Sequence, residues 1–341
     1  MPSLTRRTLL SSIPAGVSLT AAMHPAFARP EASPSAPEPP APASSPAGSA
    51  NGSAEGSAAI IPLWPGDAPP GGGGPGILLP LVSPSGAISR IAHPHLEVFR
   101  PAVPNGAAVL VAGGGGYQRI SMRHEALPAA HWLQELGVTV FVLTYRLPQE
   151  GWHAGALAPM QDAQRALRLI HAQASTYGLD PARLGVLGFS AGGHLLGLCA
   201  ARPEWRCYTP VDAADTVQPH VAVALLAYPV VTMEAPYQGT RSCHNLLGPH
   251  PSSEEARAWS IQTYIHKGCP PLFLVQAADD PITVPDNTAL LQAACQRNTV
   301  PVTRYVFPTG GHGFGLGYRK TETSTWPHLA EIWMKQQHFI S

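Results

Sequence analysis

The sequence predicts an α/β fold in which a mostly parallel sheet is covered by helices on both faces. From about residue 95 onward, short runs of apolar residues alternate with stretches of helical periodicity. The apolar runs do not alternate with polar residues, which is typical of strands buried on both faces. Of the 341 residues, 45% are hydrophobic, so the chain can bury a sizeable core.

The individual elements follow from the same periodicity. Strands are predicted where apolar and β-branched residues cluster: 107–112, 138–145, 184–189, 221–228, 271–277 and 302–307. Helices are predicted where apolar residues recur every three or four positions: 124–136, 157–177, a segment after residue 190 that ends at 200, 286–296 and 325–339. The order strand, helix, strand is typical of a single α/β domain over residues 61–341.

The N-terminus has the pattern of an export signal of the twin-arginine type. Arg6 and Arg7 stand directly before an apolar run, residues 9–23, and Ala26–Ala28 offers a small-x-small cleavage site. The run is too short to span a hydrocarbon core of about 30 Å, so we expect no membrane anchor after cleavage. Residues 1–28 are therefore predicted to direct the protein to the periplasm or the exterior.

Residues 29–60 are predicted to be a disordered spacer. They consist of Pro, Ala, Ser, Gly and Glu with almost no large apolar side chain until their end, and such a stretch cannot bury enough surface to offset its ordering entropy. Only 12% of the whole chain is charged, with 21 basic and 21 acidic residues. The sequence shows no basic patch that would bind nucleic acid.

No metal or cofactor site is predicted. None of the five cysteines forms a Cys-x-x-Cys pair, and the loop histidines lack ligand spacing. Those histidines are His153, His244 and His250. An odd number of cysteines allows at most two disulfides, and Cys199 and Cys207 are close enough in sequence to form one.

The segment Gly188–Gly192, Gly-Phe-Ser-Ala-Gly, predicts a nucleophile elbow. It joins a predicted strand to a predicted helix, so the Ser190 hydroxyl would project from a strained turn above the sheet. The flanking glycines leave room for the neighbouring backbone. The amide of Ala191 would then lie at a helix N-terminus, where it can donate to a developing oxyanion.

Three further features fall where a serine hydrolase of the α/β-hydrolase fold needs them. Glycines 113–116 follow the first core strand, so the amides of Gly115 or Gly116 could complete an oxyanion hole. Asp279 and Asp280 follow a later strand, and His312 lies between glycines after the last strand. The chain order Ser, Asp, His is that of the α/β-hydrolases.

Either aspartate could orient the histidine. We favour Asp279, because an apolar residue, Ile282, stands three positions after it as an anchor, whereas Thr283 stands in that place after Asp280. The predicted triad is therefore Ser190, Asp279 and His312.

Other residues have less specific signals. Tyr117 and Tyr228 are candidate substrate contacts, although core or loop packing is the default for Tyr228. His194 is expected to be a packed helix residue, and two groups of charged residues are expected to form structural ion pairs: Asp162 and Arg165, and Asp180 with Arg183. Residues 233–262 could form a small cap over the site.

From Leu63–Gly66 to the C-terminus the sequence resembles a bacterial group of α/β-hydrolases known as acetylxylan esterase-like, feruloyl esterase-like or endo-xylanase-like. The resemblance is carried by a series of short motifs. These are Gly116-Tyr117, Tyr145–Pro148, Asp162–Ala166, Asp180 with Arg183, Gly188–His194, Tyr228–Met233, Leu246–Gly248, Asp279–Pro281 and Gly310–Gly315. The chain departs from the family at Gly113, where the family usually has proline, and after the aspartate pair, where Ile282 and Thr283 precede Val284.

The resemblance implies a Ser190/Asp/His312 triad and an esterase activity, often on acyl groups that decorate plant polysaccharide. We expect a short acyl ester of a carbohydrate or small molecule as the substrate, cleaved through an acyl-enzyme. The same scaffold also hosts arylformamidases, amidases and peptidases, and a non-catalytic binding protein is a further alternative.

Overall fold

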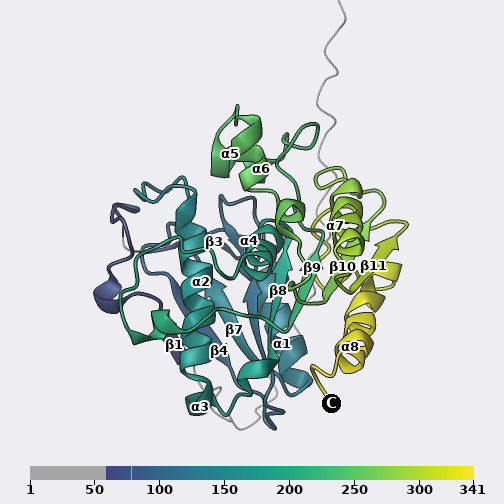
Figure 1. The fold of residues 1–341 in the computed structure, drawn as a ribbon, viewed down its shortest axis with the longest axis horizontal. Coiled ribbons are helices and arrows are strands. Elements are labelled where there is room, and N and C mark those ends of the chain that lie inside the picture. Colours follow the sequence, from purple (N-terminus) through teal and green to yellow (C-terminus); the bar gives the residue numbers. More distant parts are fainter. Residues whose placement is uncertain (1–58, 78) are drawn as a thin grey trace, which may run out of the picture. The chain divides into compact units, whose positions relative to one another are not determined.

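An eight-stranded sheet forms the centre of the computed structural model, which describes residues 59–77 and 79–341 (Figure 1). In spatial order the strands are β1 (Ala59–Pro62), β4 (His95–Phe99), β7 (Thr139–Thr144), β5 (Ala108–Ala112), β8 (Leu184–Phe189), β9 (Val223–Ala227), β10 (Leu272–Ala277) and β11 (Val302–Phe307). The strands from β7 to β11 run parallel, whereas β4 is antiparallel to both of its neighbours. The predicted α/β-hydrolase fold with a mostly parallel sheet is confirmed.

Helices cover the sheet on both faces, as predicted. They are α1 (Leu127–Glu135), α2 (Leu157–Ala172), α3 (Ala174–Tyr177), α4 (Ser190–Ala201), α5 (Arg241–Leu247), α6 (Ser253–Ala258), α7 (Asp286–Arg297) and α8 (Trp326–Gln336). On one face α2 packs against α4, and α4 and α7 both contact the helical turn Ile261–Tyr264. On the other face α1 and α8 meet through Trp132 and Trp326, whose ring centroids are 5.5 Å apart.

All the parallel strands except β11 consist of continuous buried residues. Every residue of β5, β7, β8, β9 and β10 is buried, which explains why their sequences show no polar alternation. The predicted strands 184–189 and 302–307 have the observed bounds of β8 and β11. The predicted helix 157–177 is interrupted at Gln173, between α2 and α3.

Some elements near the N-terminal side of the domain differ from the prediction. The helix predicted from residue 124 begins instead as a π-helical turn at Met122–Ala126, ahead of α1. A small second sheet, which was not predicted, consists of β2 (Leu81–Val82), β3 (Ala87–Ser89) and β6 (Ile120–Ser121). The predicted boundary between spacer and domain at residue 61 falls inside β1, so Ala59 and Ile60 belong to the sheet.

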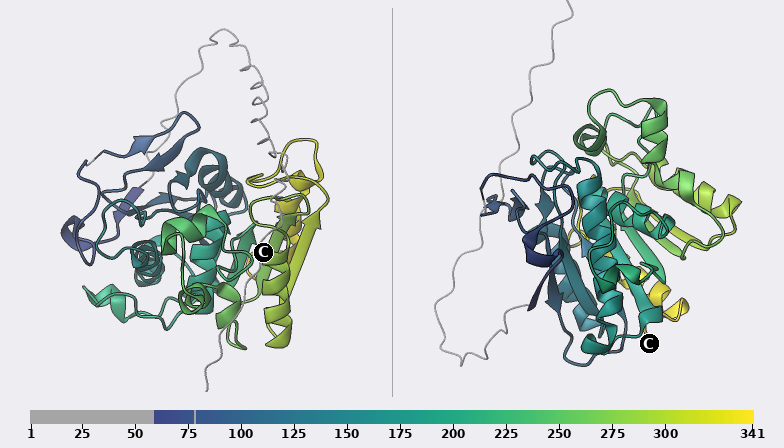
Figure 2. Two further views of the ribbon diagram at one scale, coloured as in Figure 1. Left: turned by 90° about the horizontal axis from the view of Figure 1, so that it is seen from above. Right: turned by 60° about the vertical axis from the view of Figure 1, so that its left-hand side comes forward.

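The predicted signal peptide (1–28) and the rest of the predicted spacer lie outside the described residues. Within residues 59–77 and 79–341, every helix is too short or too polar to cross a lipid bilayer. Because parallel strands end at a common edge, the loops that follow β5, β8, β10 and β11 come together there. Helices α5 and α6, within the predicted cap segment 233–262, stand apart from the sheet (Figures 1 and 2).

Candidate active site

Ser190 lies on the tight turn between β8 and α4, as the nucleophile-elbow motif predicts. Its backbone has φ +50°, a left-handed conformation that is rare for a residue with a side chain. The flanking glycines permit the turn because the neighbouring backbone leaves no space for a side chain at their positions. A Cβ at Gly188 would lie 2.4 Å from the carbonyl oxygen of Gly192, and one at Gly192 would lie 2.3 Å from that of Ala112.

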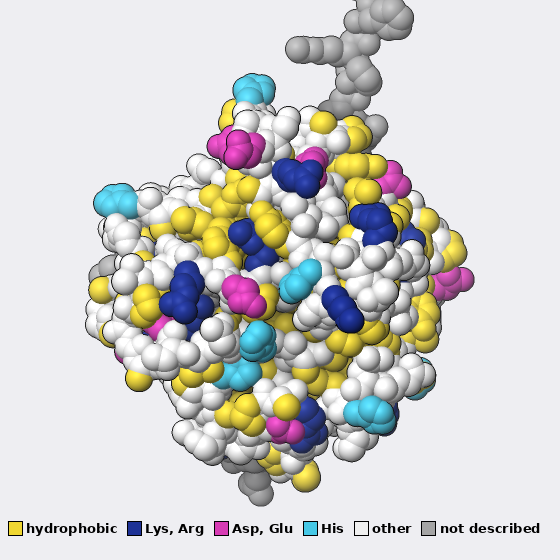
Figure 3. Space-filling model, viewed as in Figure 1, with side chains coloured by type: hydrophobic (Ala, Val, Ile, Leu, Met, Phe, Trp, Pro, Cys, Tyr) yellow, Lys and Arg dark blue, Asp and Glu magenta, His cyan; other side chains and the backbone are white. Residues whose placement is uncertain are grey.

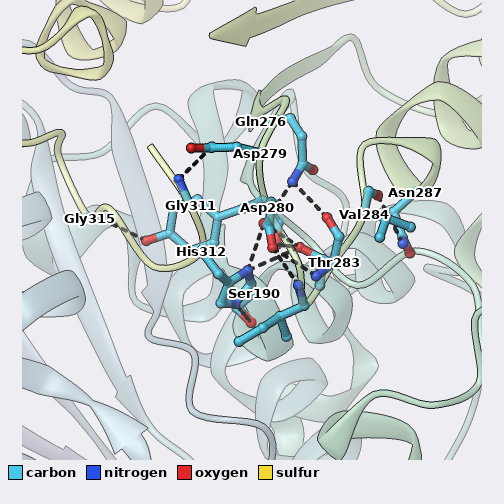
Figure 4. A network of polar contacts seen from close by, with 12 residues as sticks. Ser190, Gln276, Asp279, Asp280, Thr283, Val284, Asn287, Gly311, His312 and Gly315 are labelled. Atoms are coloured by element: carbon cyan, nitrogen blue, oxygen red, sulfur yellow. Dashed lines mark hydrogen bonds and ion pairs between the residues drawn. The ribbon is translucent and has the colours of Figure 1, made fainter. Parts of the chain in front are cut away.

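A continuous chain of hydrogen bonds runs from Ser190 through His312 to Asp280 (Figure 4). The Ser190 Oγ lies 2.8 Å from Nε2 of His312. On the other side of the ring, Nδ1 lies 2.8 Å from Oδ2 of Asp280. These three residues follow β8, β11 and β10, so the structure brings together three strand ends of the parallel sheet.

The structure corrects the predicted acid: Asp280, not Asp279, contacts His312. Asp279 is exposed, and its Oδ1 accepts a hydrogen bond from the amide of Gly311 at 2.7 Å. The anchoring residues explain the difference. Ile282, which was expected to anchor the loop after Asp279, is 53% exposed, whereas Thr283 is fully buried and its amide donates to Oδ1 of Asp280.

Asp280 is buried in an environment made of hydrogen-bond donors. The amides of Ile282 and Thr283 donate to Oδ1, at 2.8 and 3.0 Å. Gln276 Nε2 and His312 Nδ1 both lie 2.8 Å from Oδ2. The Thr283 hydroxyl lies 2.9 Å from the same oxygen, so five hydrogen-bond donors surround the two carboxylate oxygens and fix the orientation of the carboxylate.

The glycine loop after β5 lies beside Ser190, as predicted. Gly114 is held on both sides, because its amide donates to Oε2 of Glu125 at 2.7 Å and its carbonyl accepts from the amide of Ser121 at 2.9 Å. The carbonyl of Gly113 accepts from the Tyr145 hydroxyl at 2.9 Å, so the loop is fixed although it lacks the family's proline.

The predicted oxyanion-hole amides are free to donate. Among the residues that the structure describes, none accepts a hydrogen bond from the amides of Gly115, Gly116 or Ala191. Gly115, Gly116 and Ser190 line the same cavity. Three unpaired N–H groups are thus available at the loop and at the first turn of α4.

Neither tyrosine predicted to contact substrate lines that cavity. Tyr117 is buried, and its hydroxyl lies 2.7 Å from Nδ1 of His194. Tyr228 is fully buried, and its ring packs against that of His312 with centroids 5.1 Å apart. Both tyrosines therefore pack in the interior, which for Tyr228 was the default and for Tyr117 replaces the predicted substrate contact.

Tyr228 takes part in a buried network that the sequence did not reveal. Its hydroxyl donates to Oε1 of Glu125 and accepts from the amide of Gly315, each at 2.9 Å. Glu125 also accepts from Gly114, so one carboxyl group joins the glycine loop to the loop that carries His312. Burial raises the pKa of Glu125, and its two hydrogen-bond donors oppose that rise. The only sequence signal for the role of Glu125 was its position as an acidic residue near the start of a predicted helix.

A cavity of about 670 Å³ opens beside the triad. The triad loops, the glycine loop and the segment before and within α5 line it together. The lining residues include Gly115, Gly116, Arg119, His124, Glu125, Ser190, Gly239, Thr240, Arg241, Ser242, His244, Ile282 and His312. Part of the predicted cap segment 233–262 thus forms a wall of the site, and the basic residues in the wall were not predicted.

The remaining predictions concern structural residues. His194 is buried on α4, where its Nε2 lies 2.6 Å from the carbonyl of Trp259, and burial lowers its pKa to about 4. Asp180 pairs with Arg183 as expected. Asp162 pairs with Arg146, and Arg165 pairs with Asp212 and Asp215.

All five cysteine thiols are free and buried, so the suggested disulfide between Cys199 and Cys207 does not form. Across residues 59–77 and 79–341, no group of three or more His, Cys, Asp and Glu residues is arranged to hold a metal ion. The Ser190 hydroxyl beside the His312 imidazole is an arrangement suited to nucleophilic acyl transfer.

Comparisons with known proteins agree with this geometry. The family model described as BD-FAE matches residues 96–295, more than half of the chain. The acetylxylan esterase of Xylanibacter ruminicola is 29% identical over 65% of this chain and 44% of its own length. The endo-1,4-beta-xylanase B of Butyrivibrio fibrisolvens is 32% identical over 60% of this chain and 32% of its own. The chain thus spans less than half the length of these two relatives.

Solved structures are similar over most of the domain. The acetyl ester-xyloside bifunctional hydrolase from Caldicellulosiruptor lactoaceticus has a TM-score of 0.68 and 29% identity, over 84% of this chain and 98% of that one. A thermophilic esterase from Thermogutta terrifontis, at 22% identity, has a TM-score of 0.62 over 73% of this chain and 91% of its own, and supports the fold.

Proposed function

Because the chain belongs to the BD-FAE family, we propose that it is a carboxylic ester hydrolase that acts through Ser190, His312 and Asp280. The observation that carries the proposal is the hydrogen-bonded chain from Ser190 Oγ to His312 Nε2, and from His312 Nδ1 to Asp280 Oδ2. The free amides beside Ser190 and the names of the relatives, acetylxylan esterase among them, support the same reaction.

In the proposed mechanism His312 Nε2 takes the proton of Ser190 as Oγ attacks the ester carbonyl. Negative charge develops on the carbonyl oxygen and is stabilised by the amides of Ala191 and of Gly115 or Gly116. The protonated His312 gives its proton to the leaving alcohol, and an acyl-enzyme forms. Water then attacks the acyl group with His312 as the base, which releases the acid and restores the free hydroxyl of Ser190.

Asp280 stabilises the imidazolium that forms in each step. Its Oδ2 accepts from Nδ1–H, which leaves Nε2 as the basic nitrogen that faces Ser190. An asparagine at position 280 would turn an N–H group toward at least two of the five surrounding donors in either orientation. We therefore expect Asp280→Asn to lower kcat by about 10⁴-fold.

We propose esters rather than glycosides as the substrates of this site. Glycosidases use two carboxyl groups that flank the scissile bond. Among the described residues that line the cavity, Glu125 is the one carboxylic acid, and both of its oxygens accept hydrogen bonds from the protein. The names of the relatives support short acyl esters of xylan-type carbohydrate as the natural class.

The test is hydrolysis of 4-nitrophenyl acetate, butyrate and octanoate by the purified protein and three variants. Ser190→Ala and Asp280→Asn should each lower kcat by at least about 10³-fold while the far-UV spectrum stays unchanged. Asp279→Asn is the matched control, because an amide oxygen can still accept from Gly311, and its kcat should stay within about threefold. A wild-type protein that hydrolyses none of these esters would overturn the proposal. Formamides and peptides would then be tested as substrates.

We also propose that the protein is exported through a twin-arginine route. Arg6 and Arg7 before the apolar run 9–23 support this proposal. Changing both arginines to lysine should stop the appearance of the protein in the periplasmic or culture fraction. Export that continues unchanged would refute it.

A further inference from the structure

The charge of the cavity beside Ser190 differs from that of the molecule as a whole. The chain has zero formal net charge, and on the face viewed in Figure 3 acidic and basic side chains are interspersed. The cavity, in contrast, is lined by Arg119 and Arg241 together with His124 and His244. Within the described part of the chain, neither arginine forms an ion pair with a carboxylate.

The acidic residue in the lining does not neutralise the two arginines. Glu125 is 4% exposed, and its oxygens accept from the amide of Gly114 and from the hydroxyl of Tyr228. The triad carboxylate of Asp280 is likewise buried, behind His312. Two arginines therefore line a cavity in which the one acidic residue of the described lining, Glu125, is already held by other donors.

Both arginine side chains lie against the two glycines of the proposed oxyanion hole. A Cβ at Gly116 would lie 3.3 Å from both Cγ and Cδ of Arg241, and one at Gly115 would lie 2.9 Å from Cγ of Arg119. The Nη1 of Arg241 also donates to Oε1 of Gln118 at 3.3 Å, which restrains the guanidinium on this side of the loop. The arginines come from two separate segments, the glycine loop and the start of α5.

We propose that the ester cleaved at this site carries a carboxylate, which Arg119 and Arg241 bind beside the reacting carbonyl. The inference rests on the proposed esterase function and narrows its substrate class. An arginine guanidinium is a planar donor that binds carboxylate through two parallel hydrogen bonds, and it gains this interaction only if the substrate is anionic. The carboxylate belongs either to the acyl half, as in a dicarboxylic acid monoester, or to the alcohol half, as in an acylated oligosaccharide with a uronic acid branch.

The experiment compares anionic and neutral esters in two arms, with the full protein. In the acyl arm, the mono-4-nitrophenyl ester of succinic acid is compared with 4-nitrophenyl pentanoate, which has a neutral chain of similar length. In the alcohol arm, acetylated xylo-oligosaccharides with a glucuronic acid branch are compared with unbranched ones. The readout is the ratio of kcat/KM for the anionic ester to that for the neutral ester.

We expect this ratio to exceed one in one of the two arms, which identifies the half that carries the carboxylate. In that arm Arg119→Gln and Arg241→Gln should each lower the ratio by about tenfold, the size of one charge-assisted hydrogen bond. Lysine at either position should retain part of the preference, and 1 M salt should reduce it. Arg297→Gln, which removes an exposed charge on α7, is the matched control and should leave the ratio unchanged.

Two results would overturn the inference. One is a wild-type ratio at or below one in both arms, and the other is a ratio that neither glutamine variant changes. If neutral 4-nitrophenyl esters are still hydrolysed in a Ser190-dependent manner, the inference fails while the proposed esterase function stands. Absence of hydrolysis of every ester, neutral or anionic, would refute both.

Discussion

Replacing Tyr228 with phenylalanine tests whether the buried Glu125 network holds the catalytic loops together. The substitution removes one oxygen from a fully buried side chain. That oxygen donates to Oε1 of Glu125 and accepts from the amide of Gly315, each at 2.9 Å. Both partners are themselves buried, so neither can readily exchange its lost hydrogen bond for one to bulk water.

The expected loss of stability follows from these two buried groups, which are left without a hydrogen-bond partner. A buried donor or acceptor left without a partner costs about 1–3 kcal/mol. Two such groups give a loss of about 2–6 kcal/mol in the free energy of unfolding. Because Gly315 lies three residues after His312, loosening its amide should also displace the imidazole, and we expect kcat/KM to fall by about tenfold or more.

The assay is urea denaturation followed by tryptophan fluorescence, together with ester hydrolysis at saturating and limiting substrate. Tyr237→Phe is the matched control, because the Tyr237 hydroxyl donates to Oδ2 of Asp286 at an exposed site. Its stability should stay within about 0.5 kcal/mol of the wild type. A double-mutant cycle with Glu125→Gln should show a coupling energy of about 1 kcal/mol or more.

A Tyr228→Phe variant as stable as the Tyr237→Phe control would refute this reasoning. So would strict additivity in the cycle with Glu125→Gln, because the two residues would then not act through a shared hydrogen bond.

Three further predictions concern the buried parts of the domain. Because burial lowers the pKa of His194 to about 4, the unfolded state binds a proton between about pH 6.5 and 4 that the native state does not. The free energy of unfolding should therefore fall by roughly 3 kcal/mol on acidification across this window because of this residue. The measurement is the urea midpoint at pH 7, 5 and 4, which should fall less steeply for His194→Gln than for the wild type. A thiol titration in denaturant should count five reactive groups both with and without prior reduction; a lower count without reduction would indicate a disulfide. Gly192→Ala should abolish activity or folding, since its Cβ would lie 2.3 Å from the carbonyl oxygen of Ala112, and a fully active variant would contradict the observed elbow geometry.

The central part of the fold could be predicted because its signals are local. The strand β8 is a continuous buried apolar run, β11 is rich in β-branched and aromatic residues, and the bounds of both were predicted correctly. The elbow at Ser190 also depends on neighbours in sequence, because Gly188 and Gly192 leave the space that the turn requires. The edge strand β1 and its neighbour β4 were missed, since they are short, only partly buried and paired antiparallel.

The errors at the site concern features that are determined by tertiary packing and not by the local sequence. Asp279 and Asp280 are adjacent in sequence, and only the burial of Thr283 shows which carboxylate faces His312. The sequence likewise does not reveal which side of a loop an aromatic ring packs on, so Tyr117 was predicted to contact the substrate although it is buried. Glu125 could not be recognised because its role depends on partners that are distant in the chain.

The position of α5 has an evolutionary consequence. Ser190, Asp280 and His312 follow strands of the sheet, whereas the wall formed by residues 239–244 belongs to a segment inserted between β9 and β10. That segment adds no strand to the sheet, so its length and sequence can vary while the strand register and the triad are preserved. New substrate ranges can therefore arise by insertion, deletion or recombination of one stretch of chain, without a new catalytic centre.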